Sequence, residues 1–181
     1  MSALLKKIVF VVAIVITLLF LSLLGAAWYL GAFSSVSVAQ LQRPIRYFIT
    51  TSDSGTYQTA LNDLDSLQSH ISGSGLNSGD PAIFLYNDPM FTPLPQVITR
   101  AAYILTDSIS LSPPYQLFTI PPRTVLTAEI HANPSIAPYK TYPALHEWIQ
   151  RYHLIPDTTG IIVEYYQQDG AVIVELPLVS K

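Results

Sequence analysis

The stretch that decides the fold is residues 161–178, IIVEYYQQDGAVIVELPL, near the end of the chain. It contains two runs rich in β-branched and aromatic residues, 161–167 and 171–178, which are typical of strands. A tight Gln-Asp169-Gly170 turn joins them, and Asp-Gly is a common pair in two-residue hairpin turns. The sequence therefore predicts an antiparallel β-hairpin at this end of the protein.

Upstream of the hairpin, the pattern predicts a strand and then a helix. Residues 124–131 have the composition of a strand. Apolar and aromatic residues then recur at helical spacing until Pro156-Asp157, where we expect the helix to end. The recurring residues are Tyr139, Tyr142, Leu145, Trp148, Ile149 and Tyr152. This half of the chain is a β-α-β-β unit.

The preceding half repeats the same order of elements. A strand is expected at 45–50, a helix from Tyr57 to the Ser72-Gly-Ser-Gly75 stretch, and strands at 82–87 and 96–105. Short matches between the halves occur in the same order, such as Gly55-Thr-Tyr57-Gln-Thr59 with Ala137-Pro-Tyr139-Lys-Thr141. We expect an α+β fold of duplicated β-α-β-β units, forming one antiparallel sheet with two helices on one face and a concave surface on the other.

An uncharged apolar run of 23 residues, Ile8–Leu30, precedes this body, and about 20 apolar residues suffice to cross a bilayer as a helix. The alternative is a cleaved signal peptide with Lys6 and Lys7 as its basic region, but the run exceeds the usual length of about 7–15 residues. We therefore expect an uncleaved signal anchor. The predicted organisation is a cytoplasmic N-terminus (1–7), a transmembrane helix (8–30), a linker (31–42) and a ligand-binding domain (43–181).

Charge indicates the orientation and the class of partner. Lys6 and Lys7 precede the apolar run and no basic residue follows it until Arg43, which favours a cytoplasmic N-terminus. In a bacterium, the protein would be a single-pass protein of the inner membrane with its domain in the periplasm or outside. Beyond residue 40, seven basic and twelve acidic residues give 7 − 12 = −5, the wrong sign for a nucleic-acid groove.

The candidate site centres on Glu164, in an otherwise apolar strand, on the face shared with Ile162 and Tyr166. Burial of this carboxylate would require a hydrogen-bond donor or a cation, and a cationic amphipathic ligand could supply the charge. The alternative is an exposed edge strand on which Glu164 keeps the sheet soluble. The other candidate ligand-binding residues are Tyr166, Tyr139, Tyr142, Trp148 and Glu175.

Each of these residues also has a structural interpretation. Core packing of the second helix would explain Tyr142 and Trp148. Tyr139 could anchor a turn, and Glu175 could face either the pocket or solvent. The chain lacks cysteine, its four histidines form no metal-binding motif, and no nucleophile elbow is present, so no metal, cofactor or catalytic residue is predicted.

Residues 43–178 resemble the GyrI-like (gyrase-inhibitor-like) small-molecule-binding domain, which is also the effector-binding module of multidrug-sensing transcription regulators. The resemblance rests on Ala137-Pro138-Tyr139, Tyr142, Leu145-x-x-Trp148, Glu164-x-Tyr166 and Glu175-Leu-Pro177-Leu178. The chain departs from the family pattern at Ala137, where a glycine is usual, and at Phe84, which stands where the second half has Glu164. Because the segment before the body is predicted to be a membrane helix, we expect no attached DNA-binding domain and no role as a transcription regulator.

The resemblance implies that Glu164 contacts cationic ligands. The leading hypothesis is therefore a membrane-anchored, exported module with an acidic, aromatic-lined pocket for small cationic or amphipathic molecules. Some relatives are reported to hydrolyse small electrophiles, so the second hypothesis is an enzyme in which Glu164 activates water and Tyr166 polarises the leaving group. The third is a membrane-tethered protein-interaction platform that uses the proline-rich loops 89–95 and 113–122. Binding is preferred to catalysis, and the sequence names no protein partner.

Overall fold

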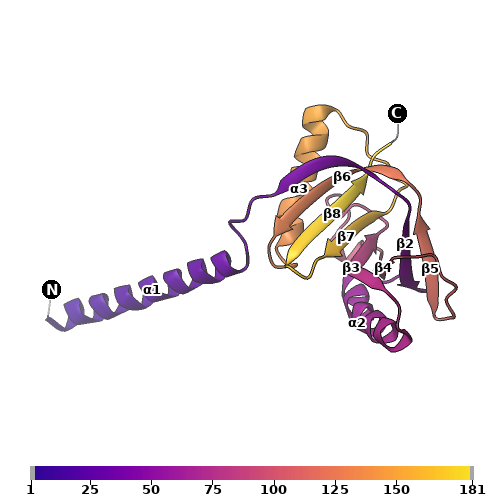
Figure 1. The fold of residues 1–181 in the computed structure, drawn as a ribbon. Helices are drawn as coiled ribbons and strands as arrows, with labels where there is room; N and C mark the ends of the chain where they lie inside the picture. Colours follow the sequence, from indigo (N-terminus) through magenta and orange to yellow (C-terminus); the bar gives the residue numbers. More distant parts are fainter. Residues whose placement is uncertain (1–2, 180–181) are drawn as a thin grey trace. The chain divides into compact units, whose positions relative to one another are not determined.

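The computed structural model describes residues 3–179 and divides into two compact units, one up to Ser34 and one from Ser35 onward (Figure 1). The first unit is helix α1, Ala3–Tyr29. Its segment Lys7–Tyr29 contains an 18-residue window with a mean hydropathy of 3.0 and is long and apolar enough to cross a membrane. A signal sequence near an N-terminus would meet the same criteria.

The second unit is built on one eight-stranded antiparallel sheet with the order β1-β6-β8-β7-β3-β4-β2-β5. The α+β class and the single antiparallel sheet predicted from the sequence are confirmed. Its strands are β1 (Ser37–Arg43), β2 (Arg46–Thr51), β3 (Ser78–Leu85), β4 (Thr99–Leu105), β5 (Tyr115–Ile120), β6 (Arg123–His131), β7 (Ile162–Tyr166) and β8 (Ala171–Pro177). Its α-helices are α2 (Tyr57–Ser74) and α3 (Ala137–Tyr152), and a 3-10 turn, η1, spans Leu94–Gln96.

The two predicted β-α-β-β units are present as β2-α2-β3-β4 and β6-α3-β7-β8, joined in the sheet through the antiparallel pair β3–β7. Two further strands were not predicted. Strand β1 precedes the first β-α-β-β unit in the sequence but pairs with β6, which belongs to the second one. Strand β5 precedes the second β-α-β-β unit but pairs with β2, which belongs to the first one. The two units therefore exchange their leading strands, and this exchange extends the sheet at both edges.

Strand β1 corrects the predicted domain boundary. Residues 31–42 were assigned to a linker, but Ser37–Arg43 pair along their whole length with Arg123–Glu129. The sequence SVAQLQR lacks the alternation of apolar and polar residues that identifies a half-buried strand. Its strand conformation comes from the partner strand, so it is visible only in the tertiary structure.

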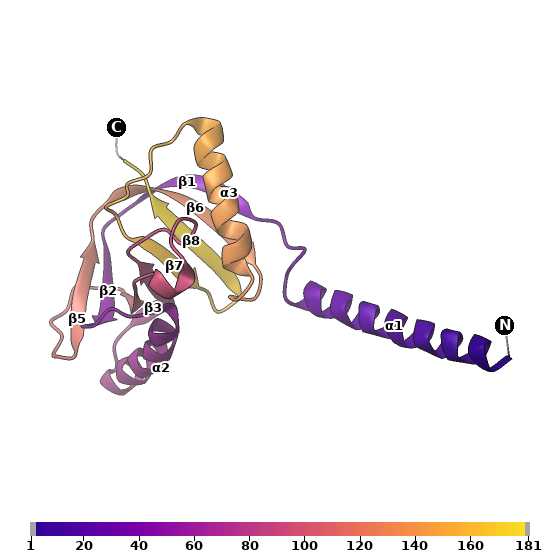
Figure 2. The ribbon, with the colours of Figure 1, turned by 180° about the vertical axis from the view of Figure 1, so that it is seen from behind.

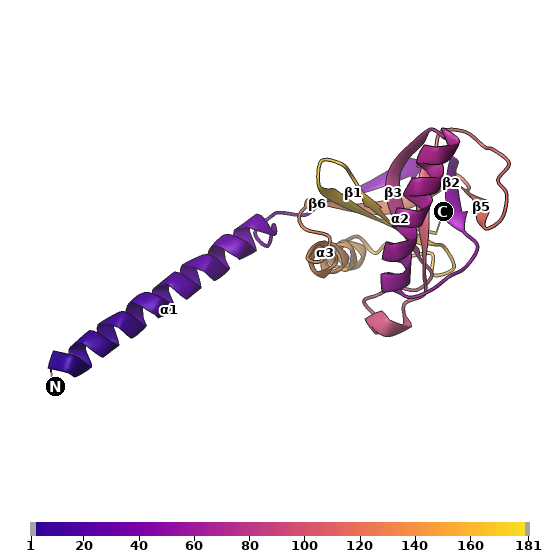
Figure 3. The ribbon, with the colours of Figure 1, turned by 90° about the horizontal axis from the view of Figure 1, so that it is seen from below.

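Helices α2 and α3 both pack on one face of the sheet, as predicted (Figure 2, Figure 3). Leu67 and Ile71 of α2 and Leu145 of α3 belong to one buried cluster with residues from β2, β3, β4, β6 and β8. The other face carries its own aromatic cluster, which includes Phe48 and Phe84 with ring centroids 5.0 Å apart. The helix-free face is therefore largely filled by side chains.

The ends of the helices follow local sequence signals. Thr56 caps α2 by accepting a hydrogen bond from the backbone N–H of Thr59. Gly75 ends the helix in the left-handed conformation, with φ of 65°. Helix α3 ends at His153, also left-handed, a few residues before the predicted stop at Pro156. The Ser72–Gly79 stretch contains the end of α2 and the start of β3, and the expected end of this helix at Ser72-Gly-Ser-Gly75 agrees with the structure.

Candidate functional site

Glu164 lies in the middle of β7 and is 1% exposed, on the face of the sheet that carries both helices. The alternation along β7 places Val163 and Tyr165 on the other face, in the aromatic cluster. The edge-strand alternative for Glu164 is excluded, because β7 pairs with β3 on one side and β8 on the other. Its carboxylate is thus buried at the centre of the domain.

Three tyrosine hydroxyls satisfy this carboxylate. Tyr142 of α3 donates to Oε1 at 2.7 Å, while Tyr57 of α2 and Tyr166 of β7 donate to Oε2 at 2.6 and 2.7 Å. The hydroxyls of Tyr57 and Tyr166 also lie in very close contact with each other. Both helices and the central strand therefore converge on one carboxylate, which we call the Glu164 cluster: Glu164, Tyr57, Tyr142 and Tyr166.

The electrostatics of the Glu164 cluster favour neutral phenols. Burial raises the pKa of Tyr57, Tyr142 and Tyr166, and the nearby Glu164 carboxylate raises each of them further, because ionisation would place a second negative charge beside the first. No basic side chain forms an ion pair with Glu164 within residues 3–179. The cluster therefore combines an acidic group with neutral donors and no cation.

A cavity of about 300 Å³ opens onto the Glu164 cluster. Its lining is dominated by aromatic, proline and aliphatic side chains, and Glu164 is its one acidic residue. The lining residues are Tyr57, Leu85, Pro89, Met90, Pro134, Ser135, Pro138, Tyr139, Tyr142, Pro143 and Glu164. Such a composition suits a ligand with an apolar body and a positive charge.

A polar contact borders the cavity on the side of α3. His146 Nε2 lies 3.0 Å from Asp88 Oδ2, and both side chains are largely buried. The ring of Phe91 stands edge-on to His146, with centroids 5.1 Å apart. This contact ties the loop that follows β3, which contains the lining residues Pro89 and Met90, to helix α3.

The structure brings four of the six predicted ligand-binding residues to this place. Glu164, Tyr142 and Tyr139 line the cavity. Tyr166 does not line it but donates a hydrogen bond to the Glu164 carboxylate. Tyr139 is 74% exposed at the mouth of the cavity. Its side chain is therefore not packed into the core, as an anchor for the turn before α3 would be. Trp148 lies elsewhere, packed on the core and against Tyr152 with centroids 4.7 Å apart.

Glu175 is buried on the opposite, helix-free face of the sheet. Its side chain therefore faces neither the Glu164 cavity nor solvent, the two positions considered from the sequence. Its carboxylate accepts from Arg43 at 2.6 Å and from Arg46 at 3.3 Å. The hydroxyl of Tyr165 donates to it at 3.2 Å, and the guanidinium of Arg46 lies over the Tyr165 ring. These contacts join β1, β2, β7 and β8, which is a structural role.

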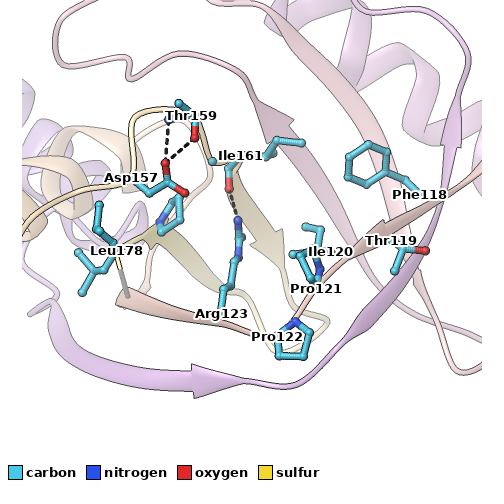
Figure 4. A pocket seen from close by; sticks show the side chains of 13 residues that line it. Phe118, Thr119, Ile120, Pro121, Pro122, Arg123, Asp157, Thr159, Ile161 and Leu178 are labelled. Atoms are coloured by element: carbon cyan, nitrogen blue, oxygen red, sulfur yellow. Dashed lines mark hydrogen bonds between the residues drawn. The ribbon is translucent and has the colours of Figure 1, made fainter. Parts of the chain in front are cut away.

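A second cavity, of about 540 Å³, lies beside this charged group and is bordered by the β5–β6 corner (Figure 4). Two of its polar side chains have partners within the domain, although the buried Nη2 atom of Arg123 has none among the described residues. Arg123 donates to the carbonyl of Ile161 at 2.8 Å, and Asp157 accepts from the backbone and hydroxyl of Thr159 (Figure 4). Burial lowers the pKa of Arg123, which disfavours its charged form. The Glu164 cavity, which combines aromatic walls with a buried carboxylate, is the better candidate for a ligand site.

Sequence reasoning missed Tyr57 as a site residue. The sequence identifies Tyr57 only as the start of a helix and as part of the repeat with Tyr139. In the structure Tyr57 opens α2 and reaches Glu164, whereas Tyr139 is exposed at the mouth. A signal was present, because a tyrosine directly after the Thr56 cap occupies the first turn of a helix, but no one-dimensional pattern shows which strand that turn faces.

A scan of the sequence against protein-family models found no match, and a search of the curated proteins found none either. Solved structures with the same fold were found. The EcmrR C-terminal domain is 12% identical, with a TM-score of 0.61 over 82% of this chain and 99% of that one. A hydrolase from Listeria innocua is 13% identical, with a TM-score of 0.58 over 79% and 92%.

A third structure is SAV2435 bound to tetraphenylphosphonium, 10% identical, with a TM-score of 0.54 over 80% of this chain and 94% of that one. At such identities the likeness establishes the fold alone. The domain therefore shares the fold of these structures, and that fold agrees with the one expected from the resemblance to the GyrI-like family.

Proposed function

We propose that this protein is a membrane-anchored small-molecule-binding module, whose cavity beside Glu164 takes a cationic, amphipathic ligand. The observation that carries the proposal is a buried carboxylate at the base of a mainly apolar cavity, whose hydrogen-bond partners within residues 3–179 are three neutral phenols. A cation that enters the cavity would meet a negative charge in a site of low effective dielectric, where the attraction is stronger than in water.

The aromatic lining supports the same class of ligand. The rings of Tyr57, Tyr139 and Tyr142 contribute to the wall, and each aromatic face can attract a cation by about 0.5–2 kcal/mol. The cavity volume suits a small organic molecule rather than a metal ion. Tetraphenylphosphonium, the compound bound to the similarly folded SAV2435, has this chemistry and is a suitable first probe.

The location is part of the proposal. We infer that α1 crosses the inner membrane of a bacterium once, with the C-terminal domain in the periplasm or outside, because of its length, its apolar composition and the two lysines before it. The module would then meet its ligand outside the cytoplasm while tied to the membrane.

The experiment is binding of tetraphenylphosphonium to the full chain, measured by calorimetry and by thermal shift, for the wild type and Glu164→Gln. We expect binding to raise the melting temperature of the wild type, and Glu164→Gln to weaken the affinity by about tenfold or more, since a lost charge–charge contact of about 1.4 kcal/mol has that effect.

The matched control is Glu147→Gln, which removes the same charge from an exposed glutamate that pairs with Arg151 on the surface of α3. Tyr57→Phe is a second site variant, because it removes a donor to Glu164 and keeps the ring. Equal binding by the wild type, Glu147→Gln and Glu164→Gln would refute the proposed site.

A hydrolytic role is a weaker second candidate, suggested by the similarly folded hydrolase from Listeria innocua. Glu164 already accepts three hydrogen bonds, whereas a carboxylate offers about four acceptor positions, which leaves little room to activate water. Release of more than one equivalent of product per protein from a small electrophile, lost in Glu164→Gln, would favour this role.

A further inference from the structure

We propose that the mouth of the Glu164 cavity docks on the lipid bilayer, so that the module takes its ligand from the membrane surface. This inference rests on the proposed function, because it assumes that α1 anchors the protein in that membrane. It adds a partner, the headgroup layer of the bilayer, as the place from which the cationic amphipathic ligand enters the cavity.

The first observation concerns the exposed apolar side chains at the mouth. Among the described residues of the domain, the two most exposed large hydrophobic side chains are Phe91, at 79%, and Tyr139, at 74%. Tyr139 lines the cavity, and Phe91 does not line it but directly follows the lining residue Met90, itself 46% exposed. We call these three residues the apolar rim.

The second observation is where the chain enters the domain. Val36, just before β1, packs against the cluster formed by Ile130, Ala132, Ala137 and Val172, together with Tyr166. Ala137 begins α3, and the residues on either side of it, including Pro134 and Pro138, line the cavity. The segment arriving from α1 therefore joins the domain at the edge that holds the cavity mouth.

The third observation is the length of that segment. Only residues 30–36 separate the end of α1 from the start of β1. Even fully extended, seven residues span at most about 25 Å, whatever their direction. If α1 crosses the membrane, the edge of the domain at Val36 stays within that distance of the bilayer, and the apolar rim beside it can reach the headgroups.

The chemistry of the rim fits this occupant. Exposed aromatic rings are favourable at the membrane–water interface, because an amphipathic ring can place its apolar part among the upper acyl chains. Entry from the bilayer would also suit a cavity whose lining is mainly apolar and aromatic and contains one carboxylate. A lipophilic cation concentrated at the interface would thus meet the mouth directly.

The test uses the full chain in phospholipid nanodiscs. Because the sequence contains no cysteine, Phe91→Cys gives a single site for an environment-sensitive fluorophore. The matched control is Ile155→Cys, an exposed apolar position beyond the far end of α3, about 24 Å from its start by helix length. Tyr139→Cys is a second rim position, in case one label disturbs docking.

We expect the labels at 91 and 139 to shift to shorter emission wavelengths in nanodiscs. A nitroxide on the lipid acyl chains should quench them about threefold or more relative to the label at 155, since only the rim would be immersed. Water-like emission at both rim positions would overturn the inference and leave the rim as a surface for another partner. Equal quenching at all three positions would also overturn it, because contact would then be non-specific.

Tetraphenylphosphonium binding in the same nanodiscs separates this inference from the proposed function. Binding lost in Glu164→Gln together with water-like rim labels would refute docking and leave the ligand site standing. Immersed rim labels without binding would refute the ligand site instead.

Discussion

At the residue scale, Glu164 is unusual because its partners are three phenols from three different elements. A buried carboxylate is costly unless it is hydrogen-bonded, and here both oxygens accept. The same arrangement makes ionisation of the tyrosines unfavourable in the folded state. The Glu164 cluster should therefore appear in the pH dependence of stability.

We expect the free energy of unfolding to be insensitive to tyrosine ionisation below about pH 10 and to fall steeply above it. The folded-state pKa values of Tyr57, Tyr142 and Tyr166 are raised, so above pH 10 the unfolded chain releases protons that the folded domain retains. Each such tyrosine removes about 1.4 kcal/mol per pH unit. Urea unfolding between pH 8 and 12 measures the slope.

Tyr57→Phe should lower that alkaline slope by about one proton, because a phenylalanine cannot ionise in either state. An unchanged slope would mean that Tyr57 ionises equally easily in the folded and unfolded chains, which is incompatible with its burial beside Glu164.

At the scale of single elements, α2 positions Tyr57 and ends in two glycines with opposite roles. Gly73 lies inside the helix, whereas Gly75 ends it with φ of 65°. A Cβ added at either position would meet no atom within 4 Å, so sterics outside the helix do not distinguish the two. Backbone conformation alone decides the effect of a substitution.

Gly73→Ala should stabilise the domain by about 0.5–1 kcal/mol, since alanine loses less entropy than glycine in a helix. Gly75→Ala should destabilise it by about 1 kcal/mol, since alanine is strained in the left-handed conformation. Chemical denaturation of the two variants gives both values. Changes of the same sign would contradict the assigned helix end.

At the scale of the whole molecule, the domain depends on a strand that the sequence assigned to a linker. Strand β1 covers β6 at one edge of the sheet and supplies Arg43 to Glu175. Without it, β6 would become an unpaired edge and Glu175 would lose its shortest ion pair. Removal of one partner of a buried carboxylate strongly destabilises the folded state, because part of the buried charge is then uncompensated.

A chain that begins at Ser35 should therefore fold, and one that begins at Pro44 should be destabilised by several kcal/mol or fail to fold. Thermal unfolding followed by circular dichroism compares the two. Equal melting temperatures would show that β1 is dispensable and would support the predicted boundary at residue 43.

Much of the site was accessible from the sequence because its key residues lie in regular elements with strong periodicity. Alternation along 161–166 placed Glu164 with Ile162 and Tyr166 on one face, and both share the helix-covered face in the structure. The sequence did not decide whether Glu175 faces the pocket or solvent, because it offered no register between the strands at 161–167 and 171–178. Only the pairing of Val163 with Glu175 fixes that relation.

The sequence by itself determined the apolar N-terminal segment, the two β-α-β-β units, the ends of α2 and the acidic residue at the centre of the cavity. These features depend on local composition and periodicity, which neighbouring residues carry. Tertiary structure alone decided the exchange of β1 and β5, the convergence of Tyr57 on Glu164 and the binding of Glu175 by Arg43 and Arg46. The side-chain contacts join residues more than 100 positions apart, and strands β1 and β5 are stabilised mainly by the strands with which they pair. Local sequence patterns do not predict either kind of interaction.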